Sequence, residues 1–234
     1  MSLLTLLVLG FFLGMRHATD TDHVVAVTTI VTRERSPRAA VGIGALWGLG
    51  HTATILLVGG AIVMFGLVIP PRLGLSMEMS VAVMLVVLGA ANLTGALRHI
   101  DQVAHGASPG HRSDVPTRSL APSRSRLLRP LAVGVVHGLA GSAAVALLVL
   151  TTMRDAASAL VYLAVFGAGT VLGMMLLTTA MALPIAALGA RFGSLERTMA
   201  RATGLISIAV GLFLAYQIGV VDGLFSAEPS WDPH

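Results

Sequence analysis

Two histidines and two aspartates fall within seven consecutive residues of an otherwise apolar stretch. They are His17, Asp20, Asp22 and His23. Imidazole and carboxylate together are typical ligands of a borderline divalent metal such as Ni, Co, Zn or Fe. The chain contains no cysteine, so thiolate ligands and thiol exchange are excluded. The residue types therefore favour a metal site built from imidazole and carboxylate.

The spacing of these residues decides which of them can share a site. On one continuous helix, His17, Asp20 and His23 lie within an arc of about 120°, while Asp22 points to another side. Asp22 joins them only if the helix unwinds. Otherwise its carboxylate would not bind the metal and would instead orient an imidazole by accepting a hydrogen bond from it. Arg16 lies four residues before Asp20, so the two can form an ion pair that competes with a metal.

Two further histidines lie inside apolar stretches and are candidates to complete or gate the site. These are His51 and His137, although each can also serve only as a packing residue. Small neighbours would let helices approach closely there, or let backbone carbonyls face a cavity. We expect supporting or gating roles for Arg16, Thr52 and Ser142.

Two other interpretations of the polar cluster stay open. It can be a buried hydrogen-bonding network that only fastens helices together. It can also be a proton relay without metal, because histidine titrates near neutrality. Each ionisable group at the centre of a bilayer costs roughly 2.5–3.5 kcal/mol on insertion scales, so five of them in eight residues, with Arg16 included, favour a functional site over fastening.

The composition indicates that the elements carrying these residues are membrane helices. The 234 residues are 55% hydrophobic and 11% charged, against about 25% charged residues in soluble chains, and the mean hydropathy is +0.85. This excludes a soluble globular enzyme, a disordered chain and a disulfide-stapled secreted domain. Six stretches reach the roughly 20 apolar residues that cross a bilayer: Leu3–Thr32, Ala39–Ile69, Leu73–Leu97, Leu131–Thr152, Ala156–Ala190 and Met199–Phe225.

The first stretch is the unusual one. It has no basic region before its apolar part and no small-residue cleavage site after it, so we take it as a membrane span and not as a signal peptide. At 30 residues it is too long for a straight perpendicular crossing. We expect it to be tilted, extended beyond the bilayer, or broken near the polar cluster.

The basic residues set the expected orientation. All 15 are arginines, and 12 of them fall in the first, third and fifth loops between the predicted spans. By the positive-inside rule these loops are cytoplasmic, which places both termini outside and the chain in the inner membrane. The basic excess is then a topology signal, and nucleic acid is excluded as a partner.

An internal repeat relates the two halves of the chain. The segment beginning Gly14-Met15-Arg16-His17 matches the one beginning Gly134-Val135-Val136-His137, and Trp47-Gly48-Leu49-Gly50 matches Phe166-Gly167-Ala168-Gly169 at nearly the same offset. Three spans per half would enter the membrane from opposite sides, as in secondary transporters with a site at the midplane. The predicted fold is an all-α membrane protein with six transmembrane helices in two inverted three-helix repeats, residues 1–98 and 131–234, joined by a cytoplasmic loop at 99–130.

These segments resemble the nickel/cobalt transporter family. The family's first signature is similar to RHATDTDHV at Arg16 to Val24, a second to LWGLGHTATIL at Leu46 to Leu56, and a Gly-Met motif to Gly173-Met174. The resemblance implies metal-handling roles for His17, Asp22, His23 and His51, with Asp20 beside them. Family members usually have eight spans and an acidic third motif, whereas this chain has six predicted spans and HGLAGSAAV at 137–145. The shorter form is similar to hydrogenase- and urease-associated nickel permeases.

The sequence therefore predicts a permease that moves Ni²⁺ or Co²⁺ through a midplane site, with no enzymatic activity and no prosthetic group. Its expected partners are the divalent ion and the lipid bilayer, and a homo-oligomer or metalloenzyme maturation factors stay open. The alternatives are a proton-coupled exporter of a small solute and a membrane accessory protein for nickel-enzyme maturation. Import and export are not distinguished.

Three weaker signals lie away from the cluster. Met77, Glu78 and Met79 could receive a metal at the outer end of the third span, although methionine is also common packing material. The long loop carries further potential ligands, more simply explained as solvated side chains, at His99, Asp101, His105, His111 and Asp114. Acidic residues of the outer tail, Asp222, Glu228 and Asp232, could attract cations weakly.

Overall fold

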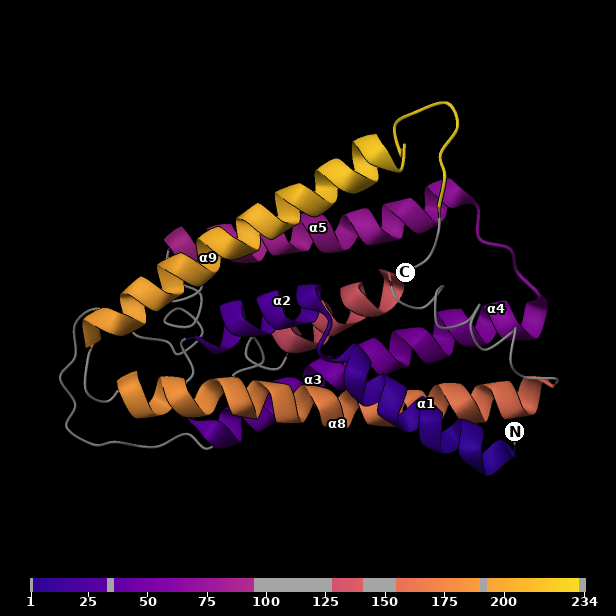
Figure 1. Cartoon of the computed structure of the whole chain (residues 1–234), viewed down its shortest axis with the longest axis horizontal. Coiled ribbons are helices and arrows are strands. Elements are labelled where there is room, and N and C mark those ends of the chain that lie inside the picture. Colours follow the sequence, from indigo (N-terminus) through magenta and orange to yellow (C-terminus); the bar gives the residue numbers. More distant parts are fainter. Residues whose placement is uncertain (1, 33–35, 95–127, 141–154, 190–192, 232–234) are drawn as a thin grey trace, which may run out of the picture.

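The structure is a computed structural model that describes residues 2–32, 36–94, 128–140, 155–189 and 193–231. The secondary structure within these ranges is helical (Figure 1). The helices are α1 (Leu3–His17), α2 (Thr21–Val31), α3 (Pro37–Thr54), α4 (Gly60–Phe65), α5 (Pro71–Thr94), α8 (Ala156–Gly189) and α9 (Gly193–Tyr216), with π-helical turns at Ile55–Gly59 and Gln217–Val221, and a shorter apolar helix at Leu128–Ala140.

Several of these helices are long and apolar enough to cross a bilayer. Four do so by themselves, at Pro37–Phe65, Pro71–Thr94, Ala156–Pro184 and Thr198–Val221, and α1 with α2 makes a fifth as a bent pair. Large apolar side chains such as Leu57, Phe65 and Phe213 are exposed at 74%, 73% and 63%, as expected for a surface that faces lipid. The chain is a multi-pass membrane protein. Of the predicted span Leu131–Thr152, only the part up to residue 140 lies within the described residues.

The first predicted span is broken at the polar cluster. Helix α1 ends at His17 and α2 begins at Thr21, with an angle of 54° between them. Asp20 takes the extended conformation of a residue that precedes a helix (φ −63°, ψ 151°), and the Thr19 hydroxyl donates to the Arg16 carbonyl at 2.6 Å. Of the three arrangements expected for this long stretch, the break is confirmed. It leaves the residues on its two sides free to point differently.

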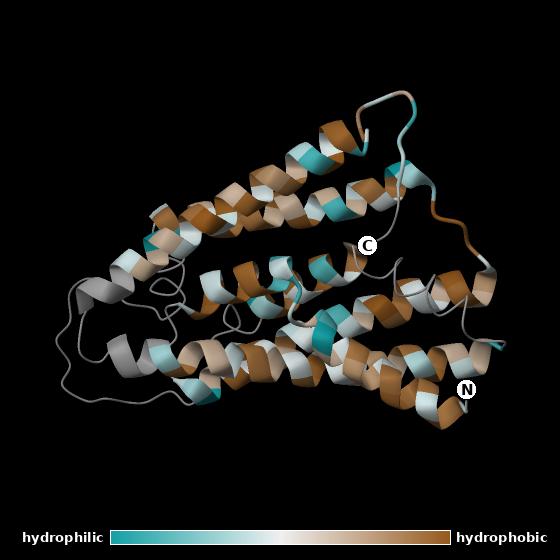
Figure 2. Ribbon diagram, viewed as in Figure 1, coloured by the Kyte–Doolittle hydropathy of each residue, from teal (hydrophilic) through white to brown (hydrophobic). Residues whose placement is uncertain are grey.

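The helices form two packed groups, with α2 between them (Figure 1). Helices α1 and α3 both pack along α8, while α5 pairs with α9, and α2 contacts α5, α8 and α9. The hydroxyl of Ser207 on α9 donates to the Leu85 carbonyl on α5 at 2.7 Å. Figure 2 shows hydrophobic residues along the long helices and hydrophilic ones at the α1–α2 junction. The polar cluster is therefore held where the two groups meet.

Glycines make the closest helix crossings, and these contacts come in corresponding pairs. A methyl group on Gly14 would overlap the carbonyl oxygen of Phe166, and one on Gly134 would overlap that of Trp47. Likewise, a Cβ on Gly169 would meet the carbonyl of Phe11, and one on Gly50 that of Leu131. Small residues are the usual means by which membrane helices bring their backbones together.

The ends of the helices are fixed by local polar contacts. Residues after α9 return along α5, where the Trp231 indole N–H donates to the Glu78 carboxylate at 2.8 Å and the Arg72 guanidinium donates to the Ser226 carbonyl at 3.1 Å. At the start of α8, Asp155 accepts from the Ser158 backbone N–H at 2.8 Å. Hydrogen bonds from the Ser158 backbone and side chain hold the pKa of Asp155 below its ordinary value.

Candidate metal centre

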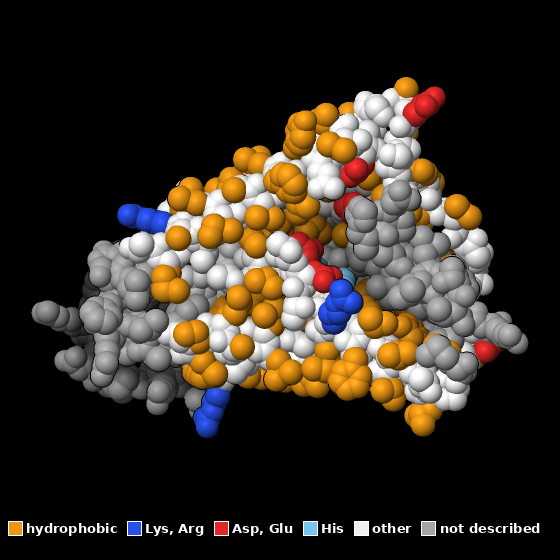
Figure 3. Space-filling model, viewed as in Figure 1, with side chains coloured by type: hydrophobic (Ala, Val, Ile, Leu, Met, Phe, Trp, Pro, Cys, Tyr) orange, Lys and Arg blue, Asp and Glu red, His pale blue; other side chains and the backbone are white. Residues whose placement is uncertain are grey.

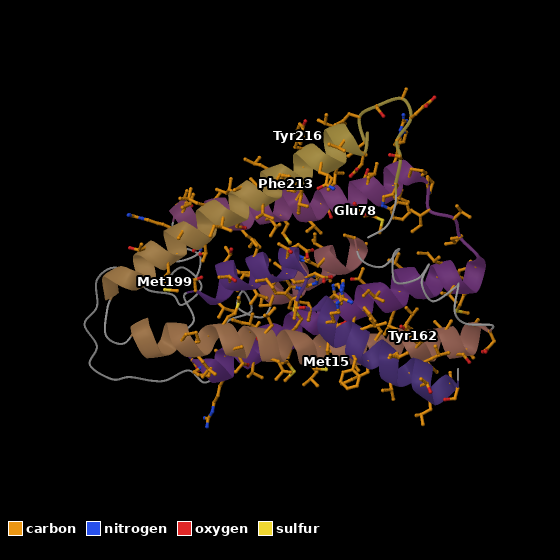
Figure 4. All side chains as sticks on the ribbon, in the orientation of Figure 1. Met15, Glu78, Tyr162, Met199, Phe213 and Tyr216 are labelled. Atoms are coloured by element: carbon orange, nitrogen blue, oxygen red, sulfur yellow. The ribbon has the colours of Figure 1, made fainter. Side chains whose placement is uncertain are left out.

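Four histidines from four helices meet at the broken span. His17 ends α1, His23 lies in the first turn of α2, His51 lies near the end of α3, and His137 lies on the Leu128–Ala140 helix. The centroid of the His23 ring lies 4.9 Å from that of His17, 5.3 Å from that of His51 and 4.6 Å from that of His137. Figure 4 shows nitrogen-bearing side chains gathered at this junction. His23 is at the centre of the group.

A first set of potential ligands consists of His17, His23 and His51, whose ligand atoms lie within 4.8 Å of one another. The Nε2 atoms of His17 and His51 are 3.1 Å apart. Two nitrogens bound to one ion at about 2.0–2.1 Å lie about 2.8–3.4 Å apart for bond angles between a right angle and a tetrahedral one. The spacing of this pair therefore fits adjacent positions around a divalent metal.

A second set consists of Asp22, His23 and His137, again within 4.8 Å. The Asp22 carboxylate is shared, with Oδ1 at 3.1 Å from His23 Nδ1 and Oδ2 at 3.5 Å from His137 Nε2. Helical periodicity predicts that Asp22 joins the cluster only if the helix unwinds. The break between α1 and α2 provides that unwinding.

Three of the imidazoles are oriented by an oxygen atom on their Nδ1 side. His17 Nδ1 lies 2.8 Å from the Asp20 carboxylate, His23 Nδ1 lies 3.1 Å from that of Asp22, and His137 Nδ1 lies 3.2 Å from the Val133 carbonyl. Since carboxylate and carbonyl oxygens only accept, each Nδ1 carries the proton in these hydrogen bonds. In the neutral ring, Nε2 then has a free lone pair. This is the arrangement that metal-binding histidines commonly adopt.

The inner ring atoms are buried and several lack a hydrogen-bond partner. Within the described residues this holds for His23 Nε2, His51 Nδ1 and His137 Nε2, and the three side chains are no more than 2% exposed. An unsatisfied buried polar atom is costly, and native proteins satisfy nearly all of them. His137 Nε2 also faces the Asp22 carboxylate, so a lone pair meets a negative charge unless a cation or a proton lies between them. The arrangement accommodates a cation.

The centre is reached from one face of the molecule. His17 and Asp22 are 19% and 29% exposed, and Asp20 is 51% exposed. Figure 3 shows acidic side chains beside a histidine and a basic side chain, surrounded by hydrophobic side chains. A cation approaching this face meets carboxylates before it meets the buried imidazoles.

The remaining predicted residues take supporting positions or lie outside the description. Asp20 belongs to neither set, because α1 has already ended and its carboxylate is directed to His17. The Asp20 carboxylate contacts His17 and does not form the ion pair with Arg16 that the spacing allowed. The Arg16 side chain is exposed. The Thr52 hydroxyl donates to the Gly167 carbonyl at 3.1 Å, which links α3 to α8. Ser142 and the histidines of the 99–130 loop lie outside the described residues.

One residue of the centre was not identified from the sequence. Trp47 is fully buried, its ring stacks on that of His23 with centroids 6.1 Å apart, and it lies 5.1 Å from the His137 ring. Its indole N–H has no partner among the described residues. The signal available in the sequence was its position one helical turn before His51, where a large aromatic residue stands among glycines.

Comparison with known proteins assigns a family. The chain is 37% identical over 223 residues to the urease accessory protein UreH of Bacillus sp. (strain TB-90), covering 95% of this chain and 96% of the relative. It is 27% identical over 210 residues to the Arabidopsis thaliana chloroplast protein FOR GROWTH AND FERTILITY 2, of which it spans 54%. No family model and no solved structure matches it. UreH is named as an accessory protein and not as an enzyme, in agreement with the expectation that this chain is no enzyme. The chain belongs to the family of the urease accessory protein UreH, which confirms the resemblance to the urease-associated members of the nickel/cobalt transporters.

Proposed function

We propose that this protein is an inner-membrane permease for Ni²⁺, with Co²⁺ as a second substrate of the same ligand chemistry. The observation that carries the proposal is the orientation of three imidazoles, each with Nδ1 held by an oxygen and Nε2 turned into a buried centre. Such a centre suits an ion of intermediate softness. Urease is a nickel enzyme, so the name of the relative supports nickel as the ion supplied.

Each group has a distinct role in this proposal. His17 and His23 are the primary ligands, and His51 and His137 complete or gate the site. Asp22 supplies negative charge. Removing water from a divalent ion is very costly, so imidazole and carboxylate ligands must replace its hydration shell inside the bilayer. The site lies at a break in a membrane helix, and broken helices are where transporters commonly place their substrates.

The architecture that we propose is a six-span inverted duplication. The glycine contacts support it, since the Gly14–Phe166 and Gly134–Trp47 crossings correspond under the same offsets as the sequence repeat. The Gly48–Val171 and Gly167–Thr52 contacts correspond to each other in the same way. Two halves of opposite orientation would allow the central site to open alternately to either side. The arginine distribution supports outer termini and cytoplasmic odd loops.

The proposal is tested by Ni²⁺ flux into proteoliposomes. We expect His23→Ala and Asp22→Asn to reduce both Ni²⁺ binding and flux, by about 10–100-fold for the loss of the carboxylate. Asp20→Asn is the matched comparison: it removes the same charge two residues away, from a half-exposed carboxylate that belongs to neither ligand set and orients His17. Its effect should be clearly smaller. Wild-type vesicles that move a proton-coupled solute but no Ni²⁺ or Co²⁺ would favour the proton-relay alternative.

An accessory function in urease maturation is the second candidate, favoured by the name of the relative. In that case the protein would bind nickel and deliver it to a maturation factor without net transport by itself. Co-purification of the detergent-solubilised protein with the host's urease maturation factors, combined with the flux assay, separates the two. Binding without flux, together with a stable complex, would support the accessory function.

A further inference from the structure

We propose that one ion occupies two alternating positions in this centre, and that His23 is the ligand common to both. This rests on the proposed function and describes how the ion would move within the site. The first position is formed by His17, His23 and His51, and the second by Asp22, His23 and His137. Transport then includes an exchange of two ligands around a histidine that stays bound.

The distances separate the ligands into two sets. Each set of three has its ligand atoms within 4.8 Å, and no larger group among the described residues meets that limit. The ring of His137 contacts those of His23 and Trp47, and within the described residues it makes no ring contact with His17 or His51. His17 and His51 contact each other, with centroids 5.1 Å apart. In this arrangement one ion does not reach all five groups at once.

His23 is placed to serve both positions. Its ring lies between the others, with contacts to His17, His51 and His137. One of its nitrogens, Nδ1, is on the Asp22 side at 3.1 Å, while Nε2 is buried without a partner among the described residues. A ligand with this position can hold the ion while the remaining ligands are replaced.

The two positions also differ in the ligands that they take from the broken span. His17 is the last residue of α1, whereas Asp22 and His23 lie in the first turn of α2. With the orientation proposed above, α1 belongs to the outer half of the span and α2 to the inner half. The first position therefore uses one ligand from each side of the break, whereas both ligands that the second position takes from this span belong to α2.

Charge distinguishes the two positions. The first is made only of imidazoles, and the two carboxylates beside it, Asp20 and Asp22, lie on the Nδ1 sides of His17 and His23. The second includes the Asp22 carboxylate itself. An ion that moves from the first to the second exchanges a neutral ligand for an anionic one, so the second position compensates more of the cost of removing water from the ion.

X-ray absorption of the Ni²⁺-loaded protein tests this directly, because imidazole ligands can be counted from their scattering. The wild-type protein should bind one ion per chain with an average of two to three imidazoles, as the two sets require. In His137→Ala the ion should be confined to the first position, with three imidazoles and no carboxylate. In His51→Ala it should be confined to the second, with two imidazoles and a carboxylate. Both variants should keep binding and lose flux.

Two comparisons make the result decisive. His23→Ala should lose binding at both positions, by more than about 100-fold, because it removes the shared ligand. Four imidazoles in the wild-type spectrum, or the same ligand set in the His51 and His137 variants, would overturn the two positions while leaving nickel transport intact. A wild-type protein that binds no Ni²⁺ contradicts the proposed function itself. If a variant does not fold, a wild-type count of four imidazoles would still overturn the two positions.

Discussion

The histidines of the centre are controlled by atoms that do not belong to the proposed ligand sets. Asp20 and the Val133 carbonyl each hold the Nδ1 of one imidazole, at 2.8 and 3.2 Å. Trp47 fixes two of the rings by packing, since it contacts both His23 and His137. Orientation of the ligands before the ion arrives reduces the cost of ordering them on binding. Affinity should therefore depend on these neighbours as well as on the ligands.

Substitution of Trp47 tests this at the residue scale. Trp47→Ala removes a fully buried ring, which costs about 3–5 kcal/mol in protein cores, and it also leaves two imidazoles without a packing surface. We expect a lower melting temperature in detergent and weaker Ni²⁺ binding by calorimetry. Trp47→Phe keeps an aromatic ring but removes the indole N–H and part of the ring volume, so it should retain more of both than Trp47→Ala. Equal nickel affinity in the Ala variant and the wild type would show that packing does not orient the rings.

At the scale of the elements, the site depends on one broken helix and on close helix crossings. The break turns the end of α1 and the start of α2 toward the same centre. The crossings then set the distance between His51 on α3, His137 on its own helix and the broken span. At Gly134 and Gly138 the backbone of the Leu128–Ala140 helix lies directly on α3, against Trp47 and His51. Small residues at these crossings are therefore part of the geometry of the site.

Two glycine-to-alanine substitutions distinguish the steric effect of a methyl group at the α1–α8 crossing from the effect of alanine on helix propensity. Gly14→Ala places a methyl group on the Phe166 carbonyl and should push α1 from α8, at a cost of about 1–3 kcal/mol as for other overpacked positions. Gly42→Ala is the control, because nothing lies within 4 Å of its Cβ and alanine favours the helix. Thermal unfolding in detergent should show a loss for Gly14→Ala and none for Gly42→Ala. Similar melting temperatures for the two would mean that this crossing can adjust.

At the scale of the whole molecule, the two helix groups meet around α2. Asn92 on α5 donates to the Ala200 carbonyl at 2.9 Å and to the Thr203 hydroxyl at 3.2 Å on α9, and its amide also lies 3.5 Å from the Thr29 carbonyl on α2. The pair of α5 and α9 is thus joined to the span that carries His23. The α5–α9 pair is therefore connected to the candidate metal centre through α2.

The absence of cysteine makes the orientation of the whole molecule easy to test, since each introduced thiol is the only one. Ser2→Cys and Ser226→Cys should react with a membrane-impermeant maleimide added to intact cells, because both positions are exposed and belong to the predicted outer side. Ser36→Cys, in the first arginine-rich loop, should react only after the cells are opened. Labelling of Ser36→Cys in intact cells would reverse the proposed topology.

The polar cluster, the helical class and the membrane location could be predicted from the sequence. A run of apolar residues has few stable alternatives to a membrane helix, and ionisable residues within it are too costly to occur without a use. His17, His23, His51 and His137 were all identified in this way, because each is a polar residue in an apolar stretch. The break in the first span was one of three expected arrangements for a stretch too long to cross directly.

The tertiary structure decided which of these residues meet. Asp22 faces His137, which lies more than 100 residues away in the chain, and Asp20 does not join it. Helical periodicity gives the opposite assignment for a continuous helix, because it describes angles within one helix and contains no information on where the helix stops or what crosses it. The contribution of Trp47 was missed for the same reason. Its contacts with His23 and His137 come from two other helices, and only their packing brings those rings within reach.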